Sequence, residues 1–391
     1  MEVRALLEMA IPLANYSSVD QYLRALDCVD AKLRSGEGDA LKRAAVRALY
    51  LCRRIGAGKR ESGDLAECKN VAAKLREAGD RRLLGDVQHS LGFALFHSSE
   101  YREAYRSAEE SFAILLEGYE ENLYLSGYFH SHAHLVGSCL HFLGEWGEVL
   151  RKIEQRVGIV EKNGDRLGST IALLERPWLQ ICAMDFAGAQ QILESALPVV
   201  ASFQFIRRYC LVLTGLAEAG LGNHQRALEQ LLTCRDSMDQ VPMLTDWYWR
   251  MPIHQALTEV WLSTGELDKA RLEAEECVKI ALPTQERTFG ALAFEVSARV
   301  AMAEGDLPKA QDRISKAVQA MEGFEVPLAH WRVHATAYEL FQRMKQRDAA
   351  KKHRELSRDT IMKLANSLPA EEPLRQIFLS APMVRKVLGD E

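Results

Sequence analysis

Apolar residues between His254 and Pro283 recur with the period of an α-helix, in two stretches separated by Gly265. The first stripe comprises Ala256, Leu257, Val260 and Trp261, and the second comprises Leu267, Ala270, Ala274, Cys277, Val278 and Ala281. A glycine between them suits a helix C-terminus, where positive φ is needed. We therefore predict an antiparallel helix pair, which needs copies of itself on either side to bury its apolar face.

Such copies recur along most of the chain. The small residue early in each second helix falls at Ala104, Val149, Ala189, Ala227, Ala270, Ala310 and Ala350, with spacings of 45, 40, 38, 43, 40 and 40 residues. Twelve residues upstream, the first helices carry Gly92, Gly137, Pro177, Gly215, Thr258, Ala298 and Tyr338. Turns are predicted at Ser98-Ser99, Gly144, Asp185, Gly222-Asn223, Gly265 and Gly305-Asp306. Pro177 is expected to kink its helix or to shift its start.

The segments SLGFALFHSSEYREAYRSAEESF, GLAEAGLGNHQRALEQLL and VSARVAMAEGDLPKAQDRISKAV resemble the tetratricopeptide (TPR) repeat. The resemblance covers about residues 80 to 365, but the spacing is near 40 residues and not the usual 34. HEAT and armadillo repeats share the longer period, which leaves an irregular α-solenoid as the alternative. The resemblance implies an all-α fold, an α-α superhelix of about eight TPR-like helical hairpins.

The two ends of the chain depart from the repeat. Residues 18–34 are predicted to form a helix, and residues 39–54 and 64–78 a degenerate hairpin. After Ser367, prolines define two short helices with the stripes Leu374, Ile377 and Phe378, and Val384, Val387 and Leu388. We expect them to cap the last apolar face of the solenoid. The predicted parts are therefore 1–79, the N-terminal helices; 80–366, the repeat array; and 367–391, the C-terminal cap.

Composition narrows the class of protein. Hydrophobic residues make up 48% and charged residues 26% of the 391 residues, a balance typical of a globular protein. A net charge of −5 argues against direct nucleic-acid binding, and no long apolar run predicts a membrane span. The eight cysteines are scattered without a C-x-x-C pair, which predicts small core residues in a reducing cytoplasm.

First helices line the concave groove in TPR-like superhelices, so their exposed faces are the candidate binding surface. The predicted groove residues are His89, Phe93, Phe96, His97, Ser131, His134, Ser138, His141, Trp178, Tyr209, Gln255, Glu259, Glu295 and Arg299. Aromatic anchors beside adjustable polar groups are typical of peptide recognition. A register error of one position would instead place the aromatics between repeats. The lysines and asparagines of the carboxylate clamp found in chaperone-binding TPR proteins are absent at the matching positions.

Two segments suggest more specific roles. In FHSHAHLVGSCLH, His130, His134 and His141 share a helix face, and two such histidines can chelate zinc. No carboxylate lies within that segment, so we favour the interpretation that these histidines only form hydrogen bonds. In DWYWRMP, an exposed member of the set Trp247, Tyr248 and Trp249 would be a partner hot spot, whereas a buried one would wedge between repeats.

The preferred function is binding rather than catalysis, because no catalytic motif, phosphate-binding loop or cofactor signature is found. With the tail, RYCLVLTGLAEAGLGNHQRALEQL, QERTFGALAFEVSARVAMAEGDL and MEGFEVPLAHWRVHATAYEL look like the C-terminal helical region of large bacterial signalling proteins. There, a TPR-like region follows an NTPase core attached to an adenylate cyclase, a kinase or a DNA-binding module. The chain is expected to be a free-standing array or the end of such a protein.

The resemblance implies a cytoplasmic interaction or sensor module, in signal transduction or transcriptional regulation, that binds a peptide, a partner domain or a small effector in the groove. No cofactor is expected. Occupancy would act through an array that flexes because each repeat touches only its neighbours. Two alternatives stay open: a metal-dependent enzyme or metal site built on the groove histidines, and a purely structural array that oligomerises, for example as a homodimer.

Overall fold

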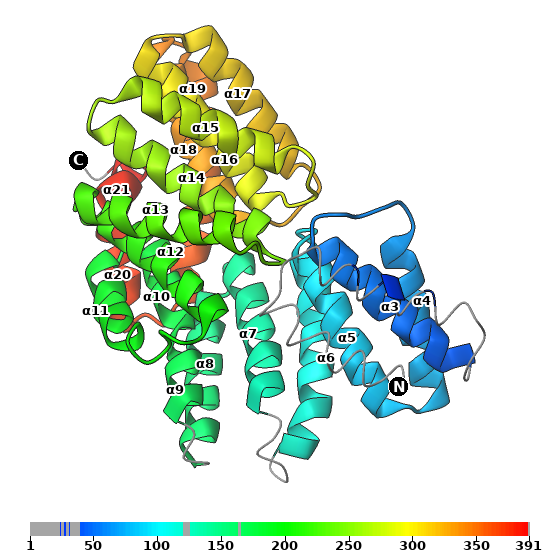
Figure 1. The fold of residues 1–391 in the computed structure, drawn as a ribbon. Coiled ribbons are helices and arrows are strands. Elements are labelled where there is room, and N and C mark those ends of the chain that lie inside the picture. Colours follow the sequence, from blue (N-terminus) through cyan, green and yellow to red (C-terminus); the bar gives the residue numbers. More distant parts are fainter. Residues whose placement is uncertain are drawn as a thin grey trace. The chain divides into compact units, whose positions relative to one another are not determined.

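The computed structural model describes residues 40–119, 126–162 and 166–389, together with Arg24, Asp27, Cys28 and Ala31. Throughout this part of the chain, the regular structure consists of helices joined by short turns, without a strand (Figure 1). The prediction of an all-α fold is therefore confirmed. No helix in these residues is both long enough and apolar enough to cross a bilayer. Most of the predicted helix at 18–34 lies outside the described residues.

The chain divides into two compact units, each described here by itself. Unit 1 comprises Met1–Cys139 and Asp236–Trp247, and unit 2 comprises Leu140–Arg235 and Tyr248–Glu391. The helices of unit 1 are α3 (Ala40–Gly56), α4 (Asp64–Ala78), α5 (Arg81–Phe96), α6 (Tyr101–Tyr119) and most of α7 (Ser126–Leu143). The predicted helices at 39–54 and 64–78 are confirmed as α3 and α4. The three-part division of the chain predicted above stays a prediction.

Unit 2 contains the remaining helices, with α13 and α14 each contributing a few residues to unit 1. They are α8 (Trp146–Lys162), α9 (Arg166–Leu173), α10 (Glu175–Cys182), α11 (Phe186–Ala196), α12 (Gln204–Gly220), α13 (His224–Gln240), α14 (Asp246–Ser263), α15 (Leu267–Ala281), α16 (Thr288–Glu304), α17 (Leu307–Met321), α18 (Pro327–Arg343), α19 (Arg347–Ser367), α20 (Pro373–Ser380) and α21 (Pro382–Leu388). Residues 166–182 form two helices, α9 and α10, because Pro177 near the start of α10 cannot continue a helix hydrogen-bond ladder.

Each hairpin repeats one local geometry. A residue with left-handed backbone ends the first helix, and the predicted small anchor follows five residues later in the second helix. The left-handed residues are Ser99, Gly144, Met184, Gly222, Gly265, Gly305 and Lys345. All seven anchors are buried, none being more than 4% exposed. The repeat register predicted from the small residues is therefore confirmed.

The small anchors allow the two helices of a hairpin to approach closely. In the hairpin of α5 and α6, a Cβ added to Gly92 would lie 3.2 Å from the carbonyl oxygen of Ala104. In the hairpin of α12 and α13, a Cβ on Gly215 would lie 2.5 Å from the side chain of Leu231. Glycine in the first helix and alanine in the second thus set the backbone separation, which is why the repeat pattern is visible in sequence.

The C-terminal helices close unit 2 on itself. Prolines occupy the first turn of both α20 and α21, as their positions predict. Leu374, Phe378, Val384 and Val387 are buried, whereas Ile377 is 38% exposed, so the predicted apolar stripe of α20 is narrower than expected. The ring of Phe378 packs at 5.1 Å from that of Trp146 at the start of α8. The expectation that each repeat touches only its neighbours is therefore wrong for unit 2.

Candidate functional site

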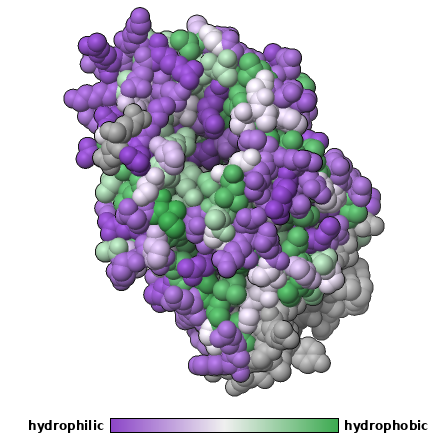
Figure 2. Space-filling view, turned by 90° about the vertical axis from the view of Figure 1, so that its left-hand side faces the viewer, coloured by the Kyte–Doolittle hydropathy of each residue, from purple (hydrophilic) through white to green (hydrophobic). Residues whose placement is uncertain are grey.

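The helices of unit 2 enclose a cavity of about 340 Å³. Its lining comes mainly from the first helices of successive hairpins, α10, α12, α14, α16 and α18. Phe142 of α7, Phe186 of α11, His224 of α13 and Met383 of α21 also contribute. Figure 2 shows a hollow in the upper part of the molecule, with hydrophilic and hydrophobic residues around it. Sites for small ligands are concave and mostly apolar, with volumes of about 300–1,000 Å³. The cavity is therefore the candidate site.

Most of the cavity wall is apolar and aromatic. Trp178, Phe289, Leu292, Leu328 and Trp331 line it, and each is either buried or close to fully buried. Large aromatic side chains give much contact area with little conformational freedom to lose. This wall is suited to an apolar side chain of a ligand.

A three-residue ionic network forms the polar part of the wall. The carboxylate of Glu259 on α14 accepts a hydrogen bond of 3.0 Å from Arg299 on α16 and another from Arg332 on α18. Burial acts to raise the pKa of Glu259, but the two guanidinium groups outweigh it and hold the pKa below its ordinary value. Burial likewise acts to lower the pKa of Arg332, and the carboxylates of Glu259 and Glu295 raise it overall. Glu259 and Arg332 are therefore charged at neutral pH.

A second carboxylate supports this network from the core. Glu295 on α16 is fully buried, and its Oε1 accepts a 2.6 Å hydrogen bond from the hydroxyl of Thr336 on α18. The same oxygen lies 4.0 Å from Nε of Arg299. Gln255, one turn before Glu259, also lines the cavity and is buried. The polar wall thus offers guanidinium, carboxylate and amide groups from neighbouring repeats.

Behind Trp178 lies an aromatic cluster that holds two more of the predicted groove residues. The Trp178 ring lies 5.7 Å from His141 and 6.3 Å from Tyr209, and Trp249 contacts both Trp178 and Tyr209. His141 is buried, with its Nε2 3.4 Å from Sγ of Cys182, and burial lowers its pKa to about 3. Burial also raises the pKa of Tyr209 well above its usual range. These groups are neutral near pH 7 and support the wall.

Unit 1 holds the other predicted groove residues, and most of them form internal contacts there. The rings of His89 and His132 stack at 3.8 Å, and Ser131 contacts Nε2 of His89 at 3.1 Å. Ser111 donates to the carbonyl of Gly85, so it must accept from Nδ1–H of His132, which fixes the tautomer of that ring. Burial lowers the pKa of both histidines, to about 3 for His132.

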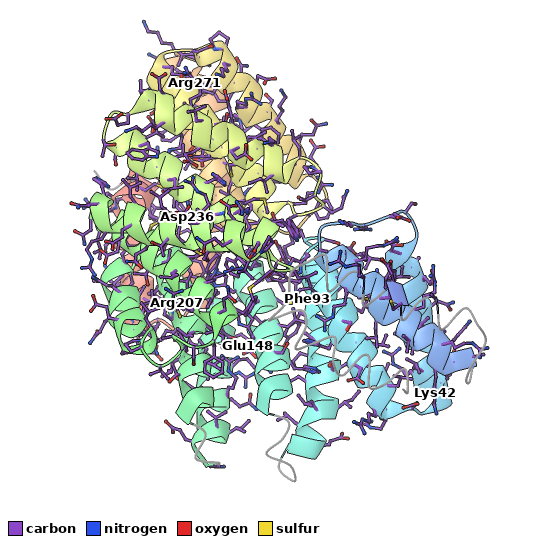
Figure 3. All side chains as sticks on the ribbon, in the orientation of Figure 1. Lys42, Phe93, Glu148, Arg207, Asp236 and Arg271 are labelled. Carbon is purple, nitrogen blue, oxygen red and sulfur yellow. The ribbon has the colours of Figure 1, made fainter. Side chains whose placement is uncertain are left out.

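A second group in unit 1 surrounds Phe93, which is labelled in Figure 3. Its ring lies 4.2 Å from that of His97, and the guanidinium of Arg53 lies 5.5 Å from the ring centre. Phe96 and His97 are buried, and burial lowers the pKa of His97 to about 4. Trp247 donates to the carbonyl of Gly56 at 2.9 Å. Of the three predicted hot-spot residues, Tyr248 is buried, while Trp247 and Trp249 are partly buried.

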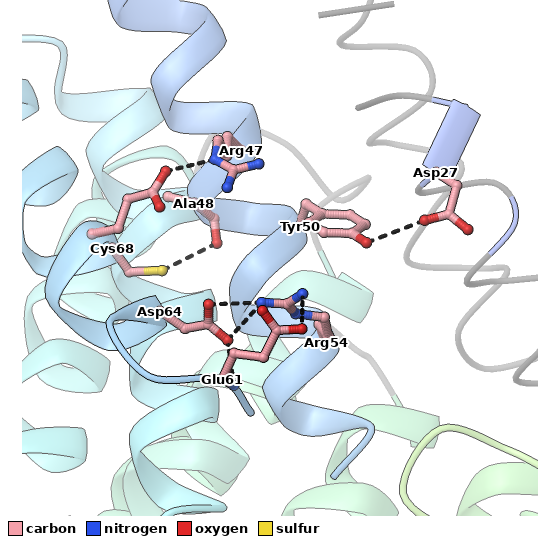
Figure 4. A network of polar contacts seen from close by, with 9 residues as sticks. Asp27, Arg47, Ala48, Tyr50, Arg54, Glu61, Asp64 and Cys68 are labelled. Atoms are coloured by element: carbon pink, nitrogen blue, oxygen red, sulfur yellow. Dashed lines mark hydrogen bonds and ion pairs between the residues drawn. The ribbon is translucent and has the colours of Figure 1, made fainter. Parts of the chain in front are cut away.

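The loop between α3 and α4 in unit 1 is held by a separate polar network (Figure 4). Arg54 binds both oxygens of Asp64, at 2.7 and 2.9 Å, and also the carboxylate of Glu61. Both contacts to Asp64 come from one nitrogen, Nη2, and such charge-assisted hydrogen bonds fix the geometry of the loop. The loop is thereby anchored to both helices, and its carboxylates are engaged in structural contacts.

Two of the histidines considered as metal ligands, His134 and His141, have polar neighbours within their own units. His134 lies 3.5 Å from the hydroxyl of Ser138 and His141 contacts Cys182, while the side chain of His130 lies outside the described residues. Across the described ranges, no group of three or more histidine, cysteine, aspartate or glutamate side chains is arranged to hold a metal ion.

The cavity brings together some predicted residues and adds others that the sequence analysis missed. Trp178, Gln255, Glu259 and Arg299 line it, and Glu295 lies behind them. Arg332 was not among the predicted groove residues. It stands six residues before Tyr338 in its repeat, and the equivalent residues of the two preceding repeats are Pro252 and Leu292. Pro252, Leu292 and Arg332 all line the cavity. Comparing this second position across repeats would have found it.

Comparisons with known proteins bear on the fold. Neither a scan against protein-family models nor a search of curated proteins by sequence finds a match. Among solved structures, a Rap protein complexed with Competence and Sporulation Factor is similar over 93% of this chain and 99% of its own, with a TM-score of 0.66 and 14% identity.

Two further structures show the same kind of similarity. NprR in complex with its cognate peptide NprX gives a TM-score of 0.51 at 12% identity, covering 100% of this chain and 99% of its own. The APC/C hetero-tetramer Cut9-Hcn1 gives 0.54 at 14% identity, covering 90% of this chain and 63% of its own. At such identities the comparisons show the fold, a TPR-like helical superhelix, as the repeat pattern predicts.

Proposed function

We propose that this TPR-like superhelix is the sensor or interaction module of a regulatory protein, and that it binds a peptide or small effector in the cavity of unit 2. One observation carries the proposal: five successive first helices line one cavity, which is mostly apolar and whose polar wall is the Glu259–Arg299–Arg332 network. A solenoid that only spaced its neighbours would need no such charged lining, since buried charge costs free energy unless it is paired.

The comparisons support the proposal at the level of fold. Of the similar structures, the Rap protein is complexed with Competence and Sporulation Factor, and NprR is complexed with its cognate peptide NprX. A superhelix of this kind can therefore hold a peptide. For this chain, the setting we propose is the cytoplasm of a bacterium, in a signalling or transcriptional pathway.

The mechanism we propose is conformational. Cavity residues come from α10, α12, α14, α16, α18 and the cap helix α21, so a bound ligand would contact nearly every hairpin of unit 2 at once. A ligand that makes these contacts in only one packing of the helices stabilises that packing relative to the others. The occupied array would then present a different surface to its effector module.

The test uses a variant that fills the cavity without removing any of its contacts. Ala219 on α12 lines the cavity and Ala187 on α11 is exposed, so Ala219→Trp fills the site and Ala187→Trp is its matched control. A library of synthetic pentapeptides is screened by isothermal calorimetry against the full chain. We expect hits that bind wild type and the control but lose at least about tenfold affinity with Ala219→Trp.

Two outcomes would contradict the proposal. If the library yields no binder, the chain is not a receptor for short peptides. If hits bind Ala219→Trp as tightly as wild type, while circular dichroism shows the variant folded, the site lies elsewhere on the protein.

A further inference from the structure

We infer that the cavity of unit 2 recognises the free C-terminal carboxylate of a short peptide whose last side chain is large and apolar. This rests on the function proposed above and specifies the ligand. The inference starts from the charges on the cavity wall. The lining contains two arginines and one glutamate, and the buried Glu295 behind it offsets the second positive charge.

The two arginines have hydrogen-bonding capacity to spare. A guanidinium has five N–H donors in a planar fork that matches a carboxylate. Arg299 and Arg332 each donate one hydrogen bond to the same oxygen, Oε1 of Glu259. Nε of Arg332 is buried without a partner. Both side chains remain partly accessible, 31% for Arg299 and 22% for Arg332, so their remaining donors can reach an incoming anion.

Glu259 positions the two arginines but accepts only one hydrogen bond from each, so other N–H donors of both guanidinium groups remain available. It lies on α14, and its partners lie on the next two first helices, α16 and α18, so one carboxylate aligns two guanidinium groups. Glu295, fully buried behind them and bonded to Thr336, balances the second positive charge. A ligand carboxylate would take up the free donors of both forks, a bidentate arrangement that arginine favours over lysine.

Apolar groups adjoin the arginines on the same helix faces. Leu328 stands four residues before Arg332 on α18, and Leu292 stands seven before Arg299 on α16; all four line the cavity. Residues at these spacings share one side of a helix. The ligand therefore needs a carboxylate and an apolar group a few bonds apart. A C-terminal Phe, Leu or Met has that geometry, whereas an aspartate or glutamate side chain carries no apolar group of its own.

The volume of the cavity and the Gln255 amide, one of several further polar groups in its lining, favour a peptide end. A volume of about 340 Å³ is near the lower limit for small-ligand sites, so it accommodates the last residues of a peptide and not an extended chain. The Gln255 amide in the buried lining offers a donor and an acceptor for the preceding peptide group. A small aromatic or aliphatic acid shares the carboxylate and the apolar group, but leaves that amide unmatched.

The test compares two forms of the same peptides on the unaltered full chain. Pentapeptides ending in Phe, Leu or Met are synthesised with a free acid or an amidated C-terminus, and binding is measured by isothermal calorimetry. We expect the amide forms to bind at least about tenfold more weakly, because a charge-assisted pair of hydrogen bonds is lost. 3-Phenylpropionate serves as the small-acid probe and is expected to bind far more weakly than the peptides.

Two variants with opposite expected effects on the affinity for free acids extend the test. Arg299→Gln should weaken the free acids about tenfold or more and leave the amides within about twofold, whereas Glu259→Gln should tighten the free acids because a competing carboxylate is removed. The matched control is Arg271→Gln, since Arg271 is an exposed arginine on α15 that pairs with Asp268 and Glu304 outside the cavity (Figure 3).

The outcomes separate the two proposals. Equal binding of acid and amide forms overturns carboxylate recognition and leaves the peptide-binding function standing. Binding of 3-phenylpropionate as tight as that of the peptides overturns the peptide end in favour of a small acid. Absence of binding by every peptide in the wider library and by 3-phenylpropionate overturns the proposed function itself.

Discussion

The backbone amide of Trp146 donates a 3.1 Å hydrogen bond to the hydroxyl of Ser367, a residue 221 positions later in the chain. Ser367 ends α19 and Trp146 begins α8, so the last hairpin of unit 2 returns to the first. In an open solenoid each repeat contacts only its neighbours, and stability spreads along the array. Closure joins the ends of unit 2 and encloses the cavity, so we expect the closing contacts to matter for the whole unit.

The first prediction concerns the cap helix α20. Phe378→Ala removes a fully buried ring that packs on Trp146 and Trp331, and should lower the free energy of unfolding by about 3–5 kcal/mol. Ile377→Ala, at the neighbouring position but 38% exposed, should cost less than about 1 kcal/mol. Urea unfolding followed by circular dichroism measures both. Similar losses for the two variants would show that the cap does not close the unit.

The second prediction compares two glycines of α8. A Cβ on Gly147 would lie 2.3 Å from the carbonyl oxygen of Ser367, whereas a Cβ on Gly158 meets nothing within 4 Å. Gly147→Ala should therefore destabilise by about 1–3 kcal/mol through overpacking against backbone. Gly158→Ala should stabilise by about 0.5–1 kcal/mol, because alanine favours a helix interior. Urea unfolding followed by circular dichroism measures the stability of both variants. A gain of stability with Gly147→Ala would contradict the close approach of α8 and α19.

Much of the repeat architecture could be predicted because its signal is local. Ala270 and Ala310 are visible in sequence as small residues at a fixed distance after Gly265 and Gly305, and the structure buries both. The chemistry of a tight helix pair dictates these residue types. Ser99, Met184 and Lys345 are counterexamples, because they adopt left-handed backbone where a glycine would be expected.

The site was harder to predict, because the orientation of each helix about its own axis decides which of its side chains face the cavity. Glu259 and Arg299 were placed in the groove and line the cavity, whereas His89 belongs to a buried stacked pair. Sequence periodicity cannot distinguish the face of a helix that lines the cavity from the face that packs against the next repeat when both carry aromatic and small residues. The role of Arg332 also depends on contacts between repeats, which only the structure supplies.

The third prediction uses Lys345. A side chain in the left-handed region costs about 1–2 kcal/mol, while glycine adopts it freely. Lys345 is exposed, so Lys345→Gly should stabilise the protein by about 0.5–1 kcal/mol. The matched control, Lys351→Gly, lies in the interior of α19 with a side chain 78% exposed, and should destabilise by about 1 kcal/mol. Thermal unfolding would contradict the turn geometry if both variants lost stability.

The last prediction concerns pH. Burial lowers the pKa of His141 to about 3, from an ordinary value of 6.5, so the folded state holds this ring neutral while the unfolded state binds a proton below pH 6.5. Stability is then complete above pH 6.5 and falls as the pH drops toward 3.

At pH 5 the His141 contribution should amount to a loss of about 2 kcal/mol relative to pH 8. His141→Leu removes the titrating group, along with an Nδ1 that is buried without a partner. Its effect at pH 8 measures packing alone, because the histidine is neutral in both states there. The comparison is urea unfolding of wild type and variant at pH 8 and pH 5, in which the variant should lose about 2 kcal/mol less than wild type on acidification. Equal losses would mean that His141 is protonated in the folded protein, and that the wall behind Trp178 opens to water.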